Sequence, residues 1–275
     1  MPFPLAGKAD APFSLAAGPH LRAAHSTSKI LWGTSAALLP IGIGSLVLFG
    51  WDALRILSIA IVSAVGFEYL FRVLFGQRHQ IQNGSTVLIA VLFAFLLAPT
   101  TPWWMVAAGS FVAVIIGKEI FGGLGQNLFH PSLVGYLTLA ALFPYELGKP
   151  IGASFLLAIF VSGAISIAKR WIPWESPVFY LGAVGTSSFV TGRPPIHEVF
   201  NGSIFLCAFF FVTDWVTTPV TREGRSCFAI GAGILTAVLR FWISPPQAMA
   251  SAILLMNALV PLLDRFVRPN SKGLR

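Results

Sequence analysis

Charged residues are scarce in this chain of 275 residues. Asp, Glu, Lys and Arg make up 10% of it, apolar residues make up 56%, and the mean hydropathy is +0.79. A soluble domain carries roughly 25% charged residues. The composition therefore excludes an ordinary soluble domain, and we expect lipid to surround most of the chain. Nucleic acid is not an expected partner, because membrane orientation accounts for the net charge of +8, as shown below.

Cysteine is nearly absent as well. Cys207 and Cys227 lie in or beside apolar runs, and no CxxC pair or Cys/His cluster with metal-ligand spacing occurs. The sequence therefore supports neither a disulfide framework nor a protein-bound iron–sulfur cluster, and we predict no metal site. We expect both cysteines to be small buried hydrophobic residues. The histidines without ligand spacing, interpreted as tail or loop residues, are His20, His25, His79 and His197.

Long apolar runs fill most of the chain. A helix that crosses a bilayer needs roughly 20 mostly apolar residues. The candidate runs are 30–49, 53–75, 84–99, 103–121, 131–144, 151–168, 175–191, 199–216, 226–242 and 246–264. We therefore predict an all-α polytopic membrane protein with about ten transmembrane helices.

The two ends of the chain are more polar. Residues 1–28 lack the apolar core of a signal peptide, so we interpret them as a cytoplasmic tail. Residues 29–265 would form one transmembrane domain with halves at about 29–145 and 150–265. Residues 266–275 would form a basic cytoplasmic tail that can bind anionic lipid.

The basic residues indicate the orientation of the predicted spans. With the N-terminus inside, 14 of the 18 Lys and Arg residues fall in cytoplasmic segments. The other four are Arg55, Lys149, Arg193 and Arg240. Cytoplasmic loops of membrane proteins carry an excess of Lys and Arg, so the pattern predicts both termini in the cytoplasm.

Two polar segments interrupt the apolar pattern. We call residues 117–131 loop 1 and residues 213–225 loop 2; each follows an apolar run, and one lies in each half. Irregular polar backbone at membrane depth must be buried in protein or line a cavity. Interrupted segments in matching positions also indicate a possible inverted repeat of two five-helix halves with a binding site between them.

The residues of loop 1 allow two interpretations. Asn127 can donate and accept hydrogen bonds, and His130 would share its face if the segment is helical. Such a pair suits the uracil-like edge of an isoalloxazine ring. Alternatively, Asn127 is a turn residue, and Pro131 simply begins the next helix. The glycines that would let backbone or ligand approach closely are Gly122, Gly123 and Gly125.

Loop 2 offers a similar choice. Thr213, Asp214 and Thr217 stand at the end of an apolar run, where Asp214 could hold a ligand hydroxyl or cap the next segment. Hydroxyls at a membrane helix end also commonly satisfy free backbone groups. The remaining candidate is Glu68, a carboxylate inside the second run. It could handle a cation or proton, or it could snorkel or pair with a nearby arginine.

The order of these segments resembles a known family. GKEIFGGLGQNLFHPSLVGY, then FP, then TDWVTTPVTREGR are similar to RnfD, an integral-membrane component of the Rnf ferredoxin:NAD oxidoreductase. RnfD is related to NqrB of the sodium-pumping NADH:quinone oxidoreductase, and together they form the NqrB/RnfD family. PWWMVAAGSFVAVIIGKEIFGG and NALVPLLDRFVRP extend the resemblance over nearly the whole chain from about residue 15.

The resemblance implies a flavin-carrying, multi-pass subunit of an ion-translocating complex in a bacterial inner membrane. Its partners would be other membrane subunits and soluble flavin or iron–sulfur redox subunits on the cytoplasmic side. A flavin, riboflavin or FMN, would bind non-covalently between the two loops, with Asn127 and Asp214 at matching positions. His130 stands where relatives usually have a second asparagine.

The chain departs from the family between the fifth and sixth runs. Relatives carry a long segment there, whose threonine bears covalent FMN, whereas this chain has only YELGKPI. SFVT at 188–191 fits that motif poorly, so we predict no covalent FMN and do not expect Thr191 to carry it. Two alternatives to an electron-carrying subunit therefore remain. One is a redox-inactive transporter or channel-like relative, and the other is a membrane anchor for soluble redox partners.

Overall fold

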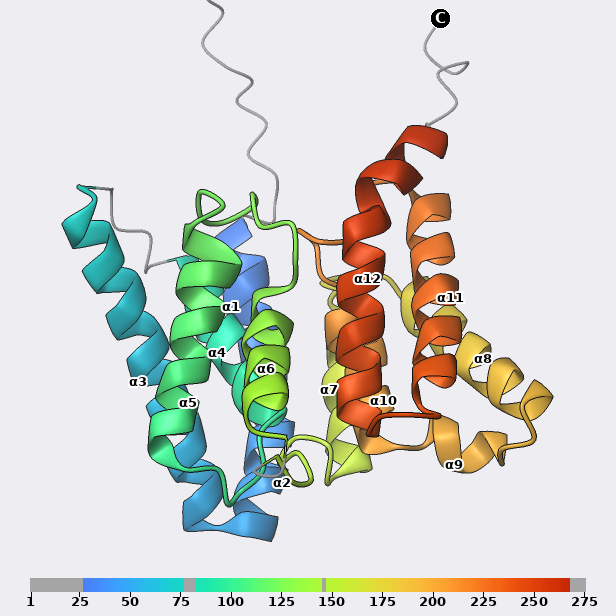
Figure 1. Ribbon diagram of the computed structural model, residues 1–275, viewed down its shortest axis with the longest axis horizontal. Helices are drawn as coiled ribbons and strands as arrows, with labels where there is room; N and C mark the ends of the chain where they lie inside the picture. The colour runs from blue at the N-terminus through green and yellow to red at the C-terminus, as the bar shows by residue number, and fades with distance from the viewer. Residues whose placement is uncertain (1–26, 77–82, 145–146, 268–275) are drawn as a thin grey trace, which may run out of the picture.

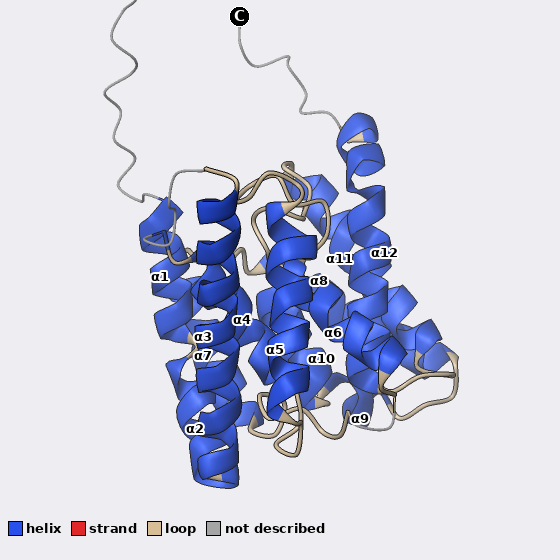
Figure 2. Ribbon diagram, turned by 60° about the vertical axis from the view of Figure 1, so that its left-hand side comes forward, coloured by secondary structure: helices blue, strands red, loops and turns tan. Residues whose placement is uncertain are grey.

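The computed structural model describes residues 27–76, 83–144 and 147–267. Within these ranges the regular elements are helices and no strand occurs (Figure 2). The predicted all-α class is therefore confirmed. Most of the two predicted tails lies outside the described residues, as do His20, His25 and His79.

The helices follow the apolar runs in order. The first half contains α1 (Thr27–Ala37), α2 (Leu39–Phe49), α3 (Trp51–Leu74), α4 (Ser85–Phe95), α5 (Trp103–Phe111), η2 (Val112–Glu119) and α6 (Pro131–Leu142). The second half contains α7 (Leu156–Ala168), α8 (Glu175–Val190), α9 (Pro195–Val199), α10 (Gly202–Leu206), η3 (Cys207–Phe211), α11 (Arg222–Leu239) and α12 (Pro245–Phe266). The elements η2 and η3 are π-helices.

Three helical segments are long and apolar enough to cross a membrane by themselves. They are Thr27–Phe49, Trp51–Leu74 and Pro245–Phe266. Many large apolar side chains also face outward, among them Val47 and Val190. The described part of the chain is thus that of a helical membrane protein. The number of spans stays a prediction, because apolar helices such as α4, α6 and α7 are shorter than 18 residues.

Several helix ends differ from the predicted runs, each for a local reason. The sixth run begins as a turn, in which Ile151 and Gly152 donate backbone hydrogen bonds to Leu97 and Phe95, so α7 starts only at Leu156. The eighth run contains only the last residue of α9, and its helical part is α10 followed directly by η3. The ninth starts earlier than predicted, because Thr221 caps α11 through a hydrogen bond from the Gly224 N–H.

The two halves lie side by side in the bundle. In Figure 1, α1 to α6 occupy one side and α7 to α12 the other. The start of α1 and the end of α12 lie at the same end of the bundle, which we call the terminal end, together with loops 1 and 2 (Figure 1). The short helix α9 lies at the opposite end.

The same tripeptide, with the same hydrogen bond inside it, stands at the start of two short helices. In the tripeptide NGS, Asn83 lies two residues before the start of α4 at Ser85, and Asn201 is the N-cap of α10. In each case the asparagine Oδ1 accepts a hydrogen bond from the serine N–H, at 3.1 Å. The helix α4 begins towards the terminal end and α10 begins beside α9, so they run in opposite directions (Figure 1). This geometry favours the predicted inverted repeat.

Glycine allows close helix packing within the second half. A Cβ on Gly233 of α11 would lie 2.6 Å from the Tyr180 carbonyl oxygen of α8 and 2.7 Å from the Ala183 Cβ. We expect Gly233→Leu to lower the free energy of unfolding by about 3 kcal/mol. The new side chain would clash with the main chain of α8, which cannot move aside as a flexible side chain could. Thermal unfolding in detergent measures this. Gly182→Leu is the control, since nothing lies within 4 Å of that position; equal melting temperatures for the two variants would refute the close packing.

Candidate functional site

A π-helix leads into each loop, and the one that leads into loop 1 shares residues 117–119 with it. The helix η2 ends at Glu119, where Ile120 N–H bonds back to Ile115, and η3 ends at Phe211, where Val212 N–H bonds back to Cys207. Such π-helical turns are rare and frequently occur at functional sites. Both loops therefore leave their helices from a widened turn.

Backbone conformation shapes loop 1. Gly122, Gly123 and Gly125 have φ angles of +110°, +91° and +87°, a region that side chains other than glycine rarely adopt. These glycines are therefore required by the backbone conformation of the turn, and no close approach of a ligand is needed to explain them. His130 is the N-cap residue of α6, and Pro131 begins that helix as predicted. Asn127 donates to the Phe129 carbonyl at 3.2 Å, which is the turn role proposed as the alternative above.

Side chains of loop 2 mostly satisfy their own backbone. Asp214 Oδ2 accepts hydrogen bonds from Thr217 N at 3.1 Å and from Thr217 Oγ1 at 2.8 Å. Thr213 Oγ1 donates to the Phe209 carbonyl. Trp215 Nε1 donates to the Trp171 carbonyl at 2.6 Å, which ties the loop to the segment after α7. Asp214 thus caps a turn through its Oδ2 atom.

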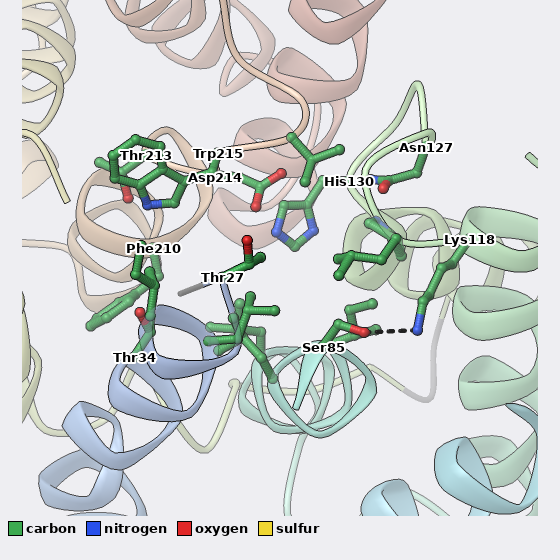
Figure 3. Close-up of a pocket in the computed structure, with 18 of the residues that line it drawn as sticks. Thr27, Thr34, Ser85, Lys118, Asn127, His130, Phe210, Thr213, Asp214 and Trp215 are labelled. Carbon is green, nitrogen blue, oxygen red and sulfur yellow. Dashed lines mark hydrogen bonds between the residues drawn. The ribbon is translucent and has the colours of Figure 1, made fainter. Parts of the chain in front are cut away.

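The two loops enclose a pocket with a cavity volume of about 200 Å³ (Figure 3). Most of its wall is apolar. The helices α1 and α4 line one side, and Ile172 and Phe210 belong to the second half. The polar lining residues are Thr27, Thr34, Ser85, Lys118, Asn127, His130, Thr213 and Asp214. An apolar wall with a few converging polar groups is typical of small-molecule sites.

His130 differs from the other lining residues, because it is buried while one of its ring nitrogens lacks a hydrogen-bond partner. Its side chain is 3% exposed, and Nδ1 has no hydrogen-bond partner among the described residues. The ring packs edge-on against Phe211 of η3, with ring centres 4.9 Å apart. The Asp214 carboxylate lies beside it (Figure 3) and interacts with it electrostatically. Buried polar atoms normally have a partner, so a ligand in the pocket would supply what Nδ1 lacks.

The structure brings together only part of the predicted site. Asn127, His130, Thr213 and Asp214 line the pocket. Gly122, Gly123, Gly125 and Thr217 are not among its lining residues. The glycines shape loop 1, and Thr217 holds the Asp214 carboxylate in place. Ser85 was missed by the sequence reasoning, although the repeated NGS tripeptide marks it.

A cluster of buried charges borders the pocket at Lys118. The Lys118 ammonium contacts Glu68 Oε1 at 2.9 Å, Ser85 Oγ at 2.9 Å and Thr86 Oγ1 at 2.7 Å. Arg72 lies 3.3 Å from Glu68 and 3.0 Å from Glu119. All four charged side chains are at most 3% exposed. Glu68 therefore does not snorkel; it pairs with Arg72, as one alternative proposed, and also with Lys118.

A second charged group lies at the α9 end of the bundle. Glu198 pairs with Arg240 and, at 3.8 Å, with Arg193, whose guanidinium also lies 4.2 Å from the centre of the Phe241 ring. Arg193 also donates to the Arg240 carbonyl at 2.9 Å. Thr191, at the end of α8, donates to Ser187 and Ser188 carbonyls. This group joins the ends of α8, α9 and α11.

The sequence interpretations of Cys227 and His197 are wrong. Cys207 is buried as predicted, but Cys227 is exposed. Cys227 lies in the second turn of α11, just after the polar first turn, and is not among the buried residues of that helix. His197, interpreted as a loop residue, lies in α9.

Comparison with known proteins identifies the relatives of this fold. The sequence profile described as the NQR2, RnfD, RnfE family matches residues 14–151 and 146–273. The chain belongs to this family. The resemblance inferred from the two loops is therefore confirmed.

Similar members of the family come from distant organisms. The D subunit of a proton-translocating ferredoxin:NAD(+) oxidoreductase complex from Clostridium ljungdahlii is 32% identical, covering 96% of this chain and 97% of the relative. The D subunit of the Na(+)-translocating complex from Acetobacterium woodii is 31% identical, covering 94% and 95%. The D subunit of an ion-translocating oxidoreductase complex from Methanosarcina acetivorans is 30% identical, covering 95% and 97%.

Proposed function

We propose that this chain is a membrane subunit of an Rnf-like, ion-translocating electron transport complex, and that it carries a non-covalently bound flavin in the pocket between loops 1 and 2. The family match and the relatives from such complexes support the first part. The pocket supports the second part, and the unpartnered Nδ1 of buried His130 is the single observation that carries it.

The lining residues suit a flat heteroaromatic ring with polar edges. Ile30, Leu88 and Phe210 offer apolar surface for the ring faces. His130 and Asn127 offer hydrogen-bonding groups for carbonyl and N–H edges, and Asp214 Oδ1 can accept from a hydroxyl or N–H. A flavin bound there would accept and pass on electrons. The cavity is below the ~300–1,000 Å³ of pockets that enclose drug-sized ligands, so part of a flavin would extend beyond it.

Two helices begin at this pocket. Ser85 is the first residue of α4, and Pro131 is the first residue of α6. Helix N-termini carry partial positive charge, which favours electron-rich carbonyl groups of a ligand. Ser85 accepts its hydrogen bond from Lys118, so its own hydroxyl proton can be donated into the pocket.

The proposed placement in the membrane follows from the charge pattern. The terminal end would face the cytoplasm of a bacterium, with the chain crossing the inner membrane about ten times. Electron-donating partners with soluble flavin or iron–sulfur domains would then meet the pocket at that face. Glu68 would take part in cation or proton handling only when its pair with Lys118 opens, because the cluster of Glu68, Arg72, Lys118 and Glu119 has balanced charge.

The absorbance spectrum of the detergent-purified chain tests this proposal. We expect flavin absorbance that moves to the supernatant when the protein is precipitated with acid, because no covalent bond would hold the ligand. Flavin that stays in the pellet would contradict the non-covalent assignment. A preparation without flavin, and unable to take up added riboflavin, would favour a redox-inactive relative or a membrane anchor.

A further inference from the structure

Asn257 is a buried polar residue near the middle of α12. Its neighbours in the stretch LLMNALV are apolar. Its side chain is fully buried, with an exposure of 0%. A buried amide is costly unless its N–H groups and its oxygen all find partners. The partners of Asn257 therefore indicate why this residue occupies the position.

Those partners are main-chain groups of both pocket loops. Oriented so that donors face acceptors, Nδ2 lies 3.1 Å from the Thr217 carbonyl oxygen of loop 2 and 3.3 Å from the Ile253 carbonyl oxygen of α12. The Oδ1 atom then accepts from the His130 N–H of loop 1, at 3.0 Å. The opposite orientation would place oxygen against oxygen and nitrogen against N–H, so the network assigns the orientation.

We infer that Asn257 is a positioning residue that sets the spacing of the two loops across the pocket. His130 N–H stands at the cap of α6, where the helix itself provides no acceptor. Thr217 in turn holds the Asp214 carboxylate. One amide thereby fixes the His130 ring of the first half against the Asp214 carboxylate of the second half.

Apart from the electrostatic interaction of Asp214 with His130, the other contacts of loop 2 within the described residues stay in the second half. Val220 N–H bonds to Asp264 of α12, and Trp215 bonds to Trp171, both within the second half. Loss of Asn257 would leave loop 2 attached to the second half, but the distance between loop 2 and His130 would no longer be fixed by this bridge. This inference rests on the proposed function only for the identity of the ligand. The distance between the two loops can be measured without any ligand.

The variants should remove the bridge without disturbing the helix. Asn257→Leu replaces the amide with an apolar side chain of similar size. Asn257→Ser is the second variant, because serine can bond to the Ile253 carbonyl as other helical serines of this chain do, for example Ser45 to Ile41. Thr236→Val is the matched control: Thr236 is equally buried but bonds to Tyr180 and Ala232 within the second half.

Spin labels report the loop spacing directly. Cysteines replace Leu128 of loop 1 and Val220 of loop 2, both exposed, in a full-length chain whose Cys207 and Cys227 are changed to alanine. We expect a narrow distance distribution in the unmodified background and with Thr236→Val, and a broadened or shifted one with either Asn257 variant. Distributions that are the same for all four proteins would overturn the inference.

Riboflavin affinity gives the second readout. In chains otherwise wild type and stripped of ligand, we expect Asn257→Leu to weaken riboflavin binding at least about tenfold, because a buried donor and a buried acceptor lose their partner. Thr236→Val should bind as the wild type does. If wild type itself binds no riboflavin, the proposed function fails, and the label distances alone decide whether Asn257 positions the loops.

Discussion

Replacing His130 and Asp214 together with alanine is expected to remove flavin from the purified protein. The Asp214 carboxylate lies beside the His130 ring at the pocket (Figure 3), and His130 Nδ1 has no hydrogen-bond partner among the described residues. Each lost hydrogen bond within a partly charged, buried site weakens binding by about 1.5–3 kcal/mol. The double variant should therefore bind riboflavin at least about 100-fold more weakly than wild type, measured by fluorescence quenching of added riboflavin.

The matched control changes the same residue types elsewhere. His197→Ala with Asp52→Ala alters one histidine and one aspartate outside the pocket lining, and should leave riboflavin affinity unchanged. His130→Asn should retain more affinity than His130→Ala, because an amide can still donate a hydrogen bond. Equal affinity of wild type and the His130/Asp214 double variant would show that flavin, if bound at all, binds outside this pocket.

Replacing Lys118 with methionine is expected to destabilise the protein by about 3–5 kcal/mol, because breaking a buried ion pair leaves an uncompensated charge. Without the ammonium, Glu68 and Glu119 would be left with Arg72 alone, in a cluster that water does not reach. Ser85 would also lose the donor that fixes its hydroxyl at the pocket wall. Thermal unfolding in detergent should show a lowered melting temperature, and flavin content should fall with it.

A second change separates charge from packing. Adding Glu68→Gln to Lys118→Met makes the pair neutral, and it should recover most of the lost stability. Arg222→Met is the control for an exposed pair: Arg222 bonds to Glu175 at 2.6 Å but is 64% exposed, so its loss should change stability by less than about 1 kcal/mol. A Lys118→Met variant as stable as Arg222→Met would contradict a closed, buried cluster.

Local signals in the sequence predicted most of the helices. Apolar runs placed an element in each predicted range, and Pro131 marked the start of α6, because such patterns act within a few residues of the chain. The start of α11 at Arg222 was missed, since its first turn is polar and depends on the Thr221 cap. The delayed start of α7 was missed because it depends on hydrogen bonds from Ile151 and Gly152 to residues of another segment.

The site was predictable only as far as its loops. Asn127, His130, Thr213 and Asp214 were found because polar residues stand out in apolar surroundings. The pairing of Glu68 with Lys118 joins residues 50 positions apart, and the bridge from Asn257 joins both halves of the chain. Such contacts follow from packing of the whole fold. No period or spacing in the chain encodes them.

Photolabelling with an azido-substituted riboflavin tests the central claim most directly. The probe is bound to the full-length chain in detergent, irradiated, and the labelled peptides are identified by mass spectrometry. We predict labels in the pocket-lining segments of α1, α4, loop 1 and loop 2, and their loss when excess riboflavin competes. Labelling that riboflavin cannot displace, or displaceable labels confined to peptides outside these segments, would contradict a flavin site between the two loops.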